Sequence, residues 1–384
     1  MAGDEHTPVS PMGALQPKEV PAPPKRSKSS RHGFVVVMNF MMSCAVFATV
    51  LLCGIVYLGK YIFEKEGPLN TPQTVLIEEG SSVAQISTKL QANGVIGDEL
   101  GVGFNDFIFR LGVRAHRAQA SLKAGEYLFK PGMSMFDVMD TIRSGKGILH
   151  KVSVPEGLTV FQIFKRLEVN DILEGDLPEE LPAEGSLMPD TYPFQRGTTR
   201  AEMLDRMKKA QSNFLQSVWN RRIDGLPIAT PEEMVILASI VEKETGRADE
   251  RPRVASVFIN RLNKGMKLQS DPTIIYGIFG GEGKPKDRPI YKSDIEKATP
   301  YNTYTIPALP PGPIANPGRA ALEAVANPSR TDDLFFVANG TGGHVFAKTL
   351  EDHNRNVKRW RAIEKQRKEE AEKKASEEAE NNSQ

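Results

Sequence analysis

Two glutamates stand close together at the end of an apolar segment, in the sequence LASIVEKET, and acidic side chains so placed can perform acid–base chemistry. Glu242 and Glu244 are separated only by Lys243. Successive residues of a helix are rotated by about 100° around its axis, so two residues two positions apart point to different flanks. We therefore expect one carboxyl group to act alone rather than both as a pair.

Glu244 is the acid that continues the apolar face of this helix. That face consists of Met234, Leu237, Ala238 and Val241. A carboxyl group on such a face is removed from water, which raises its pKa and keeps it protonated near neutral pH. A general acid that protonates a glycosidic oxygen must be in this state. The alternative is a structural role, in which Arg253 or Arg261 neutralises Glu244.

The helix that positions both acids has a defined beginning. The sequence Thr-Pro-x-Glu that starts at Thr230 predicts an N-cap, a proline at the first helical position and a capping box with Glu233. The flank opposite the apolar face should carry Glu242. We expect that residue at the surface, or in a salt bridge with Lys243 or Lys264.

Residue types and motifs exclude several classes of enzyme. Both cysteines, Cys44 and Cys53, lie in one apolar segment, so the rest of the chain has no thiol for a disulfide, a nucleophile or a thiolate metal site. The sequences His-Glu-x-x-His, Ser-x-x-Lys, Gly-x-Ser-x-Gly and the Walker loop are absent. The net charge of +1 leaves no basic excess for nucleic acid. We expect no metal, no cofactor and no nucleic-acid partner.

Residues 33–59 form an uncharged segment longer than the roughly 20 residues with which a helix crosses a bilayer. A cleaved signal peptide would have an apolar core of about 7–15 residues and a small-residue cleavage site, whereas KYIFEKE follows here. The segment is predicted to be an uncleaved transmembrane signal anchor. Basic residues before it predict a cytoplasmic N-terminus and export of the remainder. Residues 1–32, rich in Pro, Ser and Lys, are predicted to be a disordered cytoplasmic leader.

One pattern occurs twice between residues 70 and 183. Each copy predicts a short strand, a glycine turn and an amphipathic helix; the two copies are VLIEEGSSVAQISTKL and VSVPEGLTVFQIFKRL. The same order of elements is predicted for the segment between them, AGEYLFKPGMSMFDVMDTI. The pattern resembles LysM modules, which bind glycans containing N-acetylglucosamine. A structural or positioning role is the alternative.

The remainder of the chain is predicted to contain the catalytic domain. Residues 184–360 begin at a proline-rich junction, become largely helical, pass through a loop-rich stretch and end in a β-hairpin in LFFVANGTGGHVFAKT. Residues 361–384 form a charged tail, expected to be a solvated helix or disordered. The predicted fold class is α+β: a membrane anchor, small LysM-like β/α modules, and a mostly helical catalytic domain with a β-hairpin.

Five segments in a fixed order carry a specific family resemblance. They are ASIVEKET, VASVFINRL, GMKLQSDPTIIYG, YNTYTIPALPPGPIANPG and GGHVF. Together they strongly resemble the YceG-like, or MltG-type, family of endolytic murein transglycosylases. The resemblance covers most of residues 33–360.

The resemblance implies a protein of the inner membrane with a periplasmic catalytic domain. Such enzymes cleave the β-1,4 bond between N-acetylmuramic acid and N-acetylglucosamine in nascent peptidoglycan strands and leave a 1,6-anhydro end. The catalytic glutamate of the family corresponds to Glu244, and Thr245 matches the Ser or Thr that generally follows it. Peptidoglycan synthases of the penicillin-binding type are implied as partners.

Four polar residues in the loop-rich stretch are predicted to contact sugar: Gln269, Asp271, Asn302 and Tyr304. Asp-Pro and Asn-Thr sequences also set turns, which is the alternative for these positions. Tyr276 is a weaker candidate, and His344 is expected to be structural.

Three alternatives to this reading remain open from the residues alone. A hydrolase would need a second acid, for which Asp271 and Asp249 are the candidates. A wall-binding scaffold would use Glu244 only as a paired core acid. An assembly protein would regulate synthetic partners and depend on the anchor segment itself.

Overall fold

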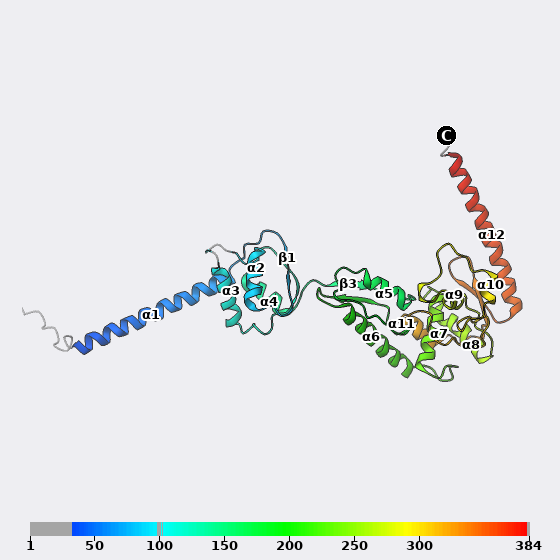
Figure 1. Ribbon diagram of the computed structural model, residues 1–384, viewed down its shortest axis with the longest axis horizontal. Helices are drawn as coiled ribbons and strands as arrows, with labels where there is room; N and C mark the ends of the chain where they lie inside the picture. The colour runs from blue at the N-terminus through cyan, green and yellow to red at the C-terminus, as the bar shows by residue number, and fades with distance from the viewer. Residues whose placement is uncertain (1–32, 98–100, 102, 382–384) are drawn as a thin grey trace, which may run out of the picture.

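The computed structural model describes residues 33–97, 101 and 103–381. A long N-terminal helix leads into two small units of strands and helices, and these are followed by a helical unit with a β-hairpin and by a projecting C-terminal helix (Figure 1). This mixture of helix and small sheets confirms the predicted α+β composition. The predicted leader, residues 1–32, lies outside the described residues.

The first helix, α1 (Gly33–Glu64), is uncharged from its start to Gly59. Within the described chain it is the one helix long and apolar enough to cross a membrane, which is consistent with a single-pass anchor. Its last turn behaves differently, because Ile62 and Phe63 are buried against the next unit. The helix is therefore built into the fold at its C-terminal end.

The first unit contains β1 (Gln73–Ile77), α2 (Val83–Ala92), α3 (Phe104–Ala115), β2 (Gly125–Phe129) and α4 (Met135–Ser144). The two strands are antiparallel, with Gln73 opposite Phe129. Capping boxes at Ser82 and Ser134 begin α2 and α4, and both satisfy backbone N–H groups at the helix start. The predicted strand–turn–helix pattern is confirmed. Its description as LysM-like stays a prediction.

The second unit contains β3 (His150–Ser153), α5 (Val160–Glu168), β4 (Thr191–Phe194) and α6 (Arg200–Asn220). Antiparallel β3 and β4 pair His150 with Phe194, and one apolar core joins residues 152–207. β4 and the first turns of α6 contribute to this core, although they lie beyond the predicted boundary between 183 and 184, and the division into domains stays a prediction. Sequence alone could not pair β3 with a strand about 40 residues later.

The helical unit is built around α7 (Pro231–Glu244), which packs against α6, α8 (Arg251–Asn263), α9 (Asp271–Phe279) and α11 (Arg319–Ala326). A short 3₁₀ helix, η3 (Gly280–Glu282), follows α9, and α10 (Lys292–Glu296) follows it in the loop-rich stretch. Every residue from Met234 to Val241 is buried, so α7 has no solvent-facing side along most of its length. It is a central helix rather than a surface helix with one apolar stripe.

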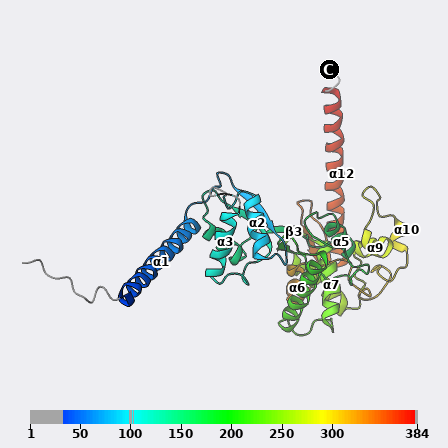
Figure 2. The same cartoon turned by 60° about the vertical axis from the view of Figure 1, so that its left-hand side comes forward.

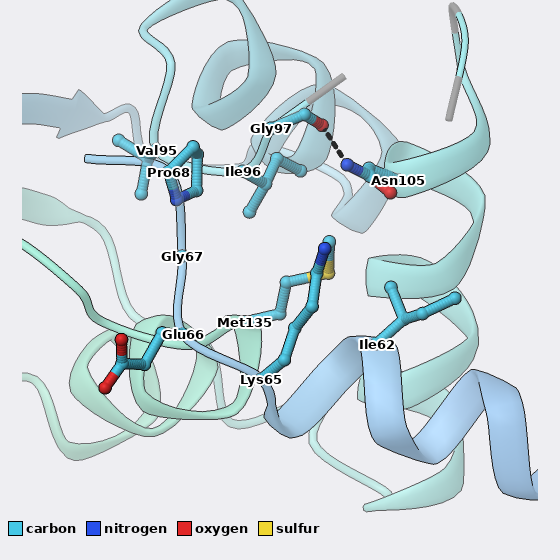
Figure 3. Close-up of a pocket in the computed structure, with 10 residues that line it drawn as sticks. All are labelled: Ile62, Lys65, Glu66, Gly67, Pro68, Val95, Ile96, Gly97, Asn105 and Met135. Carbon is cyan, nitrogen blue, oxygen red and sulfur yellow. Dashed lines mark hydrogen bonds between the residues drawn. The ribbon is translucent and has the colours of Figure 1, made fainter. Parts of the chain in front are cut away.

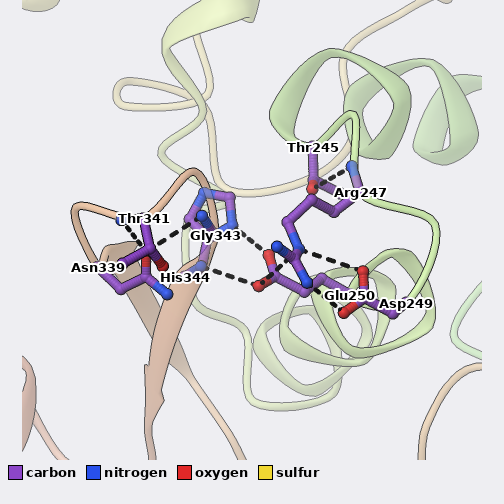
Figure 4. A network of polar contacts seen from close by, with 8 residues as sticks. All are labelled: Thr245, Arg247, Asp249, Glu250, Asn339, Thr341, Gly343 and His344. Carbon is purple, nitrogen blue, oxygen red and sulfur yellow. Dashed lines mark hydrogen bonds and ion pairs between the residues drawn. The ribbon is translucent and has the colours of Figure 1, made fainter.

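The predicted hairpin is present as β5 (Phe335–Ala338) and β6 (His344–Ala347), followed by α12 (Leu350–Asn381). His344 interacts through Nδ1 with Glu250 Oε2 at 2.8 Å, and its backbone N–H donates to Glu250 Oε1 (Figure 4). The hairpin is thereby held against the loop between α7 and α8, the loop that starts just after Glu244. A structural role for His344 agrees with these contacts.

Candidate active site

Glu244 is the last residue of α7, and the predicted N-cap begins this helix. The Thr230 side chain accepts from the backbone N–H of Glu233. The reciprocal half of the capping box differs, because the Glu233 carboxylate accepts from Ala229 N–H. The helix ends because Thr245 is extended, at φ −142°, and its hydroxyl accepts from Arg247 N–H (Figure 4). Glu244 thus stands where a buried helix opens into a loop.

The Glu244 carboxyl group has one hydrogen-bond partner among the described side chains. Ser270 Oγ donates to Glu244 Oε1 at 2.5 Å. Ser270 is 1% exposed and is itself held by its backbone N–H, which donates to Thr303 Oγ1 at 2.9 Å. The carboxyl group is therefore oriented by a hydroxyl whose own position is set by the loop-rich stretch.

Burial raises the pKa of Glu244 to about 7, against the hydrogen bond from Ser270, which lowers it. The negative charge of Asp271 raises the pKa further, and the positive charge of Arg261 lowers it. Although the protein around the carboxyl group is dense, the residue keeps partial access to solvent. A carboxyl group that is protonated near neutral pH and reachable from solvent is suited to general acid catalysis.

Neither arginine that could have neutralised Glu244 forms an ion pair with it. Arg253 pairs with Asp333 at 2.7 Å. Arg261 is buried and donates to backbone carbonyl oxygens, including those of Leu334 at 2.7 Å and Leu268 at 2.8 Å. Neither arginine therefore pairs with Glu244 in the way that a structural role for this acid would require.

Three of the predicted sugar-contacting residues surround this acid. Asp271 is exposed at the first position of α9, and its Oδ1 accepts from Tyr304 Oη at 2.7 Å. Tyr304 is half-buried, and burial raises the pKa of its hydroxyl. Gln269 is exposed, with φ 54°, and its Oε1 accepts from Arg261 at 3.3 Å. These residues form a polar rim beside Glu244.

The fourth predicted contact residue, Asn302, is placed differently. It is 0% exposed, and its Nδ2 donates to the carbonyl oxygens of Ile295 and Lys297 at 2.9 and 2.7 Å. Its Oδ1 accepts from Tyr304 N–H at 3.0 Å. With its amide group enclosed in this way, Asn302 holds the loop that presents Tyr304, so the expectation of direct sugar contact is corrected to a positioning role.

Glu242 is also placed differently from the expectation. Its side chain is 5% exposed and accepts from Arg251 at 3.4 Å and from Gly318 N–H at 2.9 Å. Burial raises the pKa of its carboxyl group. The predicted salt bridge exists, but with Arg251 rather than Lys243 or Lys264. The physical reason is that α11 and the second unit cover the flank of α7 that an isolated helix would expose to water.

A further acid that lies largely in the interior, Glu184, was missed by sequence reasoning. Glu184 accepts through Oε1 from Val160 N–H at 2.8 Å and from Asn316 Nδ2 at 3.0 Å, and through Oε2 from Tyr276 Oη at 3.3 Å. Burial raises the pKa of its carboxyl group. Because its hydroxyl group donates to Glu184, Tyr276 belongs to this internal hydrogen-bond network. The position of Glu184 at the start of the proline-rich junction gave no signal of such a network.

Other predicted candidates lie apart from Glu244. Asp249 is exposed and pairs with Arg247 at 2.6 Å, so it belongs to the surface beside the hairpin (Figure 4). Within residues 33–97, 101 and 103–381, no three His, Cys, Asp or Glu side chains are grouped to hold a metal ion. Ser270, whose hydroxyl donates to Glu244, was not singled out by the sequence pattern, and Arg261, whose positive charge lowers the pKa of Glu244, was named only as a possible neutralising partner.

Comparison with known proteins identifies relatives along most of the chain. The model of a family described as the YceG-like family matches residues 75–359. An endolytic murein transglycosylase of Bacillus subtilis is 31% identical over 344 residues, which cover 81% of this chain and 91% of that protein. One of Streptococcus pneumoniae is 30% identical over 374 residues, which cover 84% of this chain but only 65% of that protein.

A solved structure is also similar to this chain. A putative YceG-like protein from Listeria monocytogenes is 32% identical in sequence. The match covers 74% of this chain and 98% of that one, with a TM-score of 0.44.

Proposed function

The chain belongs to the YceG-like family, and on that premise we propose that it is a peptidoglycan lytic transglycosylase that cuts glycan strands internally. Its substrate is the β-1,4 bond between N-acetylmuramic acid and N-acetylglucosamine in nascent strands. Its product is a strand that ends in a 1,6-anhydro sugar, and Glu244 is its single catalytic acid and base.

The proposed reaction needs one group that first gives and then takes a proton. Glu244 donates its proton to the glycosidic oxygen while the bond from that oxygen to C1 of the muramoyl sugar breaks. The C6 hydroxyl oxygen of the same sugar forms the new bond to C1 and releases its proton to the Glu244 carboxylate. Atoms balance without water, and the enzyme returns to its starting protonation state.

The observation that carries this proposal is the environment of Glu244. The carboxyl group has a pKa raised to about 7 by burial and a hydrogen bond from Ser270, and no cation of the described residues forms an ion pair with it. At that pKa the acid and its conjugate base are both accessible near neutral pH, as a group used in both directions requires. Glu242 has a raised pKa too, but Arg251 and Gly318 enclose it.

We assign substrate contact to the rim around this acid. Asp271 and Gln269 are exposed, and Tyr304 offers an aromatic ring with a polar end, a combination that suits a sugar face and its hydroxyl groups. The Tyr304 hydroxyl donates to Asp271, which leaves the remaining carboxylate oxygen of Asp271 able to accept from a sugar hydroxyl.

The location follows from α1. We propose that α1 anchors the protein in the inner membrane, with the N-terminus in the cytoplasm and the catalytic unit in the periplasm near nascent strands. Peptidoglycan synthases of the penicillin-binding type are then the expected neighbours.

Product analysis by mass spectrometry tests the reaction. The full-length protein in detergent is incubated with uncrosslinked glycan strands, in parallel with Glu244→Gln and with Glu232→Gln. Glu232 lies exposed in the first turn of the same helix and provides a matched control. We expect products one water lighter than hydrolysis products from the wild type and from Glu232→Gln, and no cleavage by Glu244→Gln.

Two outcomes would contradict the proposal. Reducing ends would identify a hydrolase, with Asp271 as the second acid, since its charge already acts on Glu244. Full activity of Glu244→Gln would remove that residue from the chemistry and return the site to a structural role.

A further inference from the structure

One helix of the first unit exposes an apolar face. On α3, Phe104, Phe107 and Leu111 are 41%, 54% and 51% exposed, and their spacing of three and four residues places them on one side. The opposite side of the helix, which carries Phe109 and Val113, is buried in the core of the unit, and Ile108 is buried at the edge of the exposed face. A helix on a soluble surface normally exposes polar residues, so this face needs a partner.

The exposed face of α3 is also basic. Arg110, Arg114 and Arg117 are exposed on or beside the same side, and only Arg110 has an acidic partner on this helix, Asp106 at 2.6 Å. A helix with Phe and Leu on one face and flanking arginines is typical of segments that lie in the plane of a membrane surface. The arginines match the phosphate groups of anionic lipids.

The position of α3 puts this face beside the membrane anchor. It packs against the last turns of α1, and it lies on the side of the unit from which α1 emerges in both overall views (Figures 1 and 2). The Phe63 ring lies against Gly112, stacks on His116 at 5.8 Å and packs near Phe109 at 6.4 Å. The contact therefore involves the last turn of α1, just after its apolar segment, where the chain would leave the bilayer.

The connection between α1 and the unit is tight. Gly67 passes so close to Met133 that an added Cβ would lie 2.1 Å from the Met133 carbonyl oxygen. The cavity at this joint, lined by Ile62, Lys65 and Asn105 among others, holds only about 10 Å³, which is room for one water at most (Figure 3). Because no free linker separates α1 from the unit, a membrane-spanning α1 keeps α3 at the membrane surface.

We propose that the exposed face of α3 lies in the headgroup region of the membrane that α1 crosses, with its phenylalanines among the upper acyl chains and its arginines on anionic phospholipid. This inference rests on the proposed membrane anchor. Tyr57 and Tyr61, both exposed at the same end of α1, supply the aromatic residues expected at such an interface. The first unit then sits on the bilayer as a base for the units that follow.

Tryptophan fluorescence in vesicles tests the contact. Full-length Phe107→Trp is reconstituted into phosphatidylethanolamine and phosphatidylglycerol, with and without brominated acyl chains that quench tryptophan within the bilayer. The parent protein gives the background fluorescence of the two native tryptophans, Trp219 and Trp360. Val50→Trp, in the middle of α1, reports insertion of the anchor, and Val169→Trp, 79% exposed on the second unit, is the water-facing control. Leu111→Trp is a second probe on the same face, and circular dichroism verifies folding.

We expect brominated lipid to quench Val50→Trp, Phe107→Trp and Leu111→Trp, and to leave Val169→Trp unchanged. Adding Arg114→Glu, or omitting phosphatidylglycerol, should reduce quenching at position 107 but not at position 50. Quenching at position 50 without quenching at 107 and 111 would overturn the α3 proposal while leaving the anchor intact. Absence of quenching at all three positions would refute the anchor, and the α3 proposal with it.

Discussion

The two small units have the same local pattern, but the first is attached to α1 and the second to the helical unit. In each, a glycine turn precedes a helix begun by a capping box, formed by Ser82 with Gln85 in the first and by Thr159 with Gln162 in the second. The first unit buries the end of α1 in its core. The second is joined to the helical unit by backbone contacts across the chain.

Those contacts surround the turn before α5. Gly157 N–H donates to the Asn316 carbonyl oxygen, and Asn316 N–H donates to that of Leu158, at 3.0 and 2.9 Å. Thr159 Oγ1 donates to the Gly281 carbonyl oxygen, and Lys243 Nζ to that of Gly157. Because Lys243 adjoins Glu244, the second unit braces the end of the helix that carries the candidate acid. One local pattern thus buries the end of α1 in one copy and supports the helix of the candidate acid in the other.

Phe63→Ala should produce the largest effect and confine it to the first unit. Phe63 is 4% exposed, and truncation of a buried phenylalanine costs about 3–5 kcal/mol of unfolding free energy. Hydrogen exchange should rise across residues 73–144, with turnover of glycan strands in detergent unchanged. Tyr61→Ala, at an exposed neighbouring position, is the control. A matching loss of turnover would mean that the two units are coupled.

Asn316→Ala should have a smaller effect, located in the other unit. Its side chain accepts from Leu187 N–H at 3.0 Å and donates to Leu158 and Glu184. Removing it leaves a buried donor without a partner, which costs about 1–3 kcal/mol. Thermal unfolding should shift and turnover should fall together, since the joint beside α7 loosens. Asn220→Ala, at the exposed end of α6, should change neither quantity.

The pH dependence of turnover should follow Glu244. With a pKa of about 7, the protonated acid is depleted by about a factor of ten for each pH unit above 7, and the rate should decline with it. The first unit has no part in this profile, so Phe63→Ala should leave it unshifted. A profile that is flat from pH 6 to 9 would rule out Glu244 as the acid.

Stability should depend on the same group with a definite sign. The folded state keeps a proton on Glu244 between pH 4.5 and 7, whereas the unfolded chain has released it, so unfolding free energy falls as pH rises through this window. Glu244→Gln should therefore be more stable than the wild type at pH 8, and the difference should vanish near pH 4.5. Chemical denaturation at both pH values measures it.

Tyr304→Phe should produce the smallest change. It removes the hydrogen bond to Asp271, which is worth about 0.5–1.5 kcal/mol, while keeping the ring. Turnover should fall by a factor between about two and ten, with unfolding unchanged. Tyr301→Phe, at a half-buried neighbouring position that packs on Tyr276, should have no such effect on turnover.

Much of the local structure was predictable from residue types and spacing. Thr230 and Pro231 begin α7 as expected, the strand–turn–helix pattern recurs in both small units, and the hairpin lies where its turn residues predict it. Glu244 was selected by the helical wheel. Such features depend on contacts between residues a few positions apart, which the order of residues specifies directly.

Tertiary structure alone decided the rest, because it depends on which distant segments cover a side chain. Glu242 looked exposed on the helical wheel, yet Arg251 and Gly318 enclose it. Asn302 was predicted from its residue type to contact sugar, yet its amide group forms hydrogen bonds inside the loop. Burial and hydrogen-bond partners come from chain segments tens of residues away. That burial raises the pKa of Glu244, whereas the hydrogen bond from Ser270 lowers it, and among the described residues no cation forms an ion pair with Glu244.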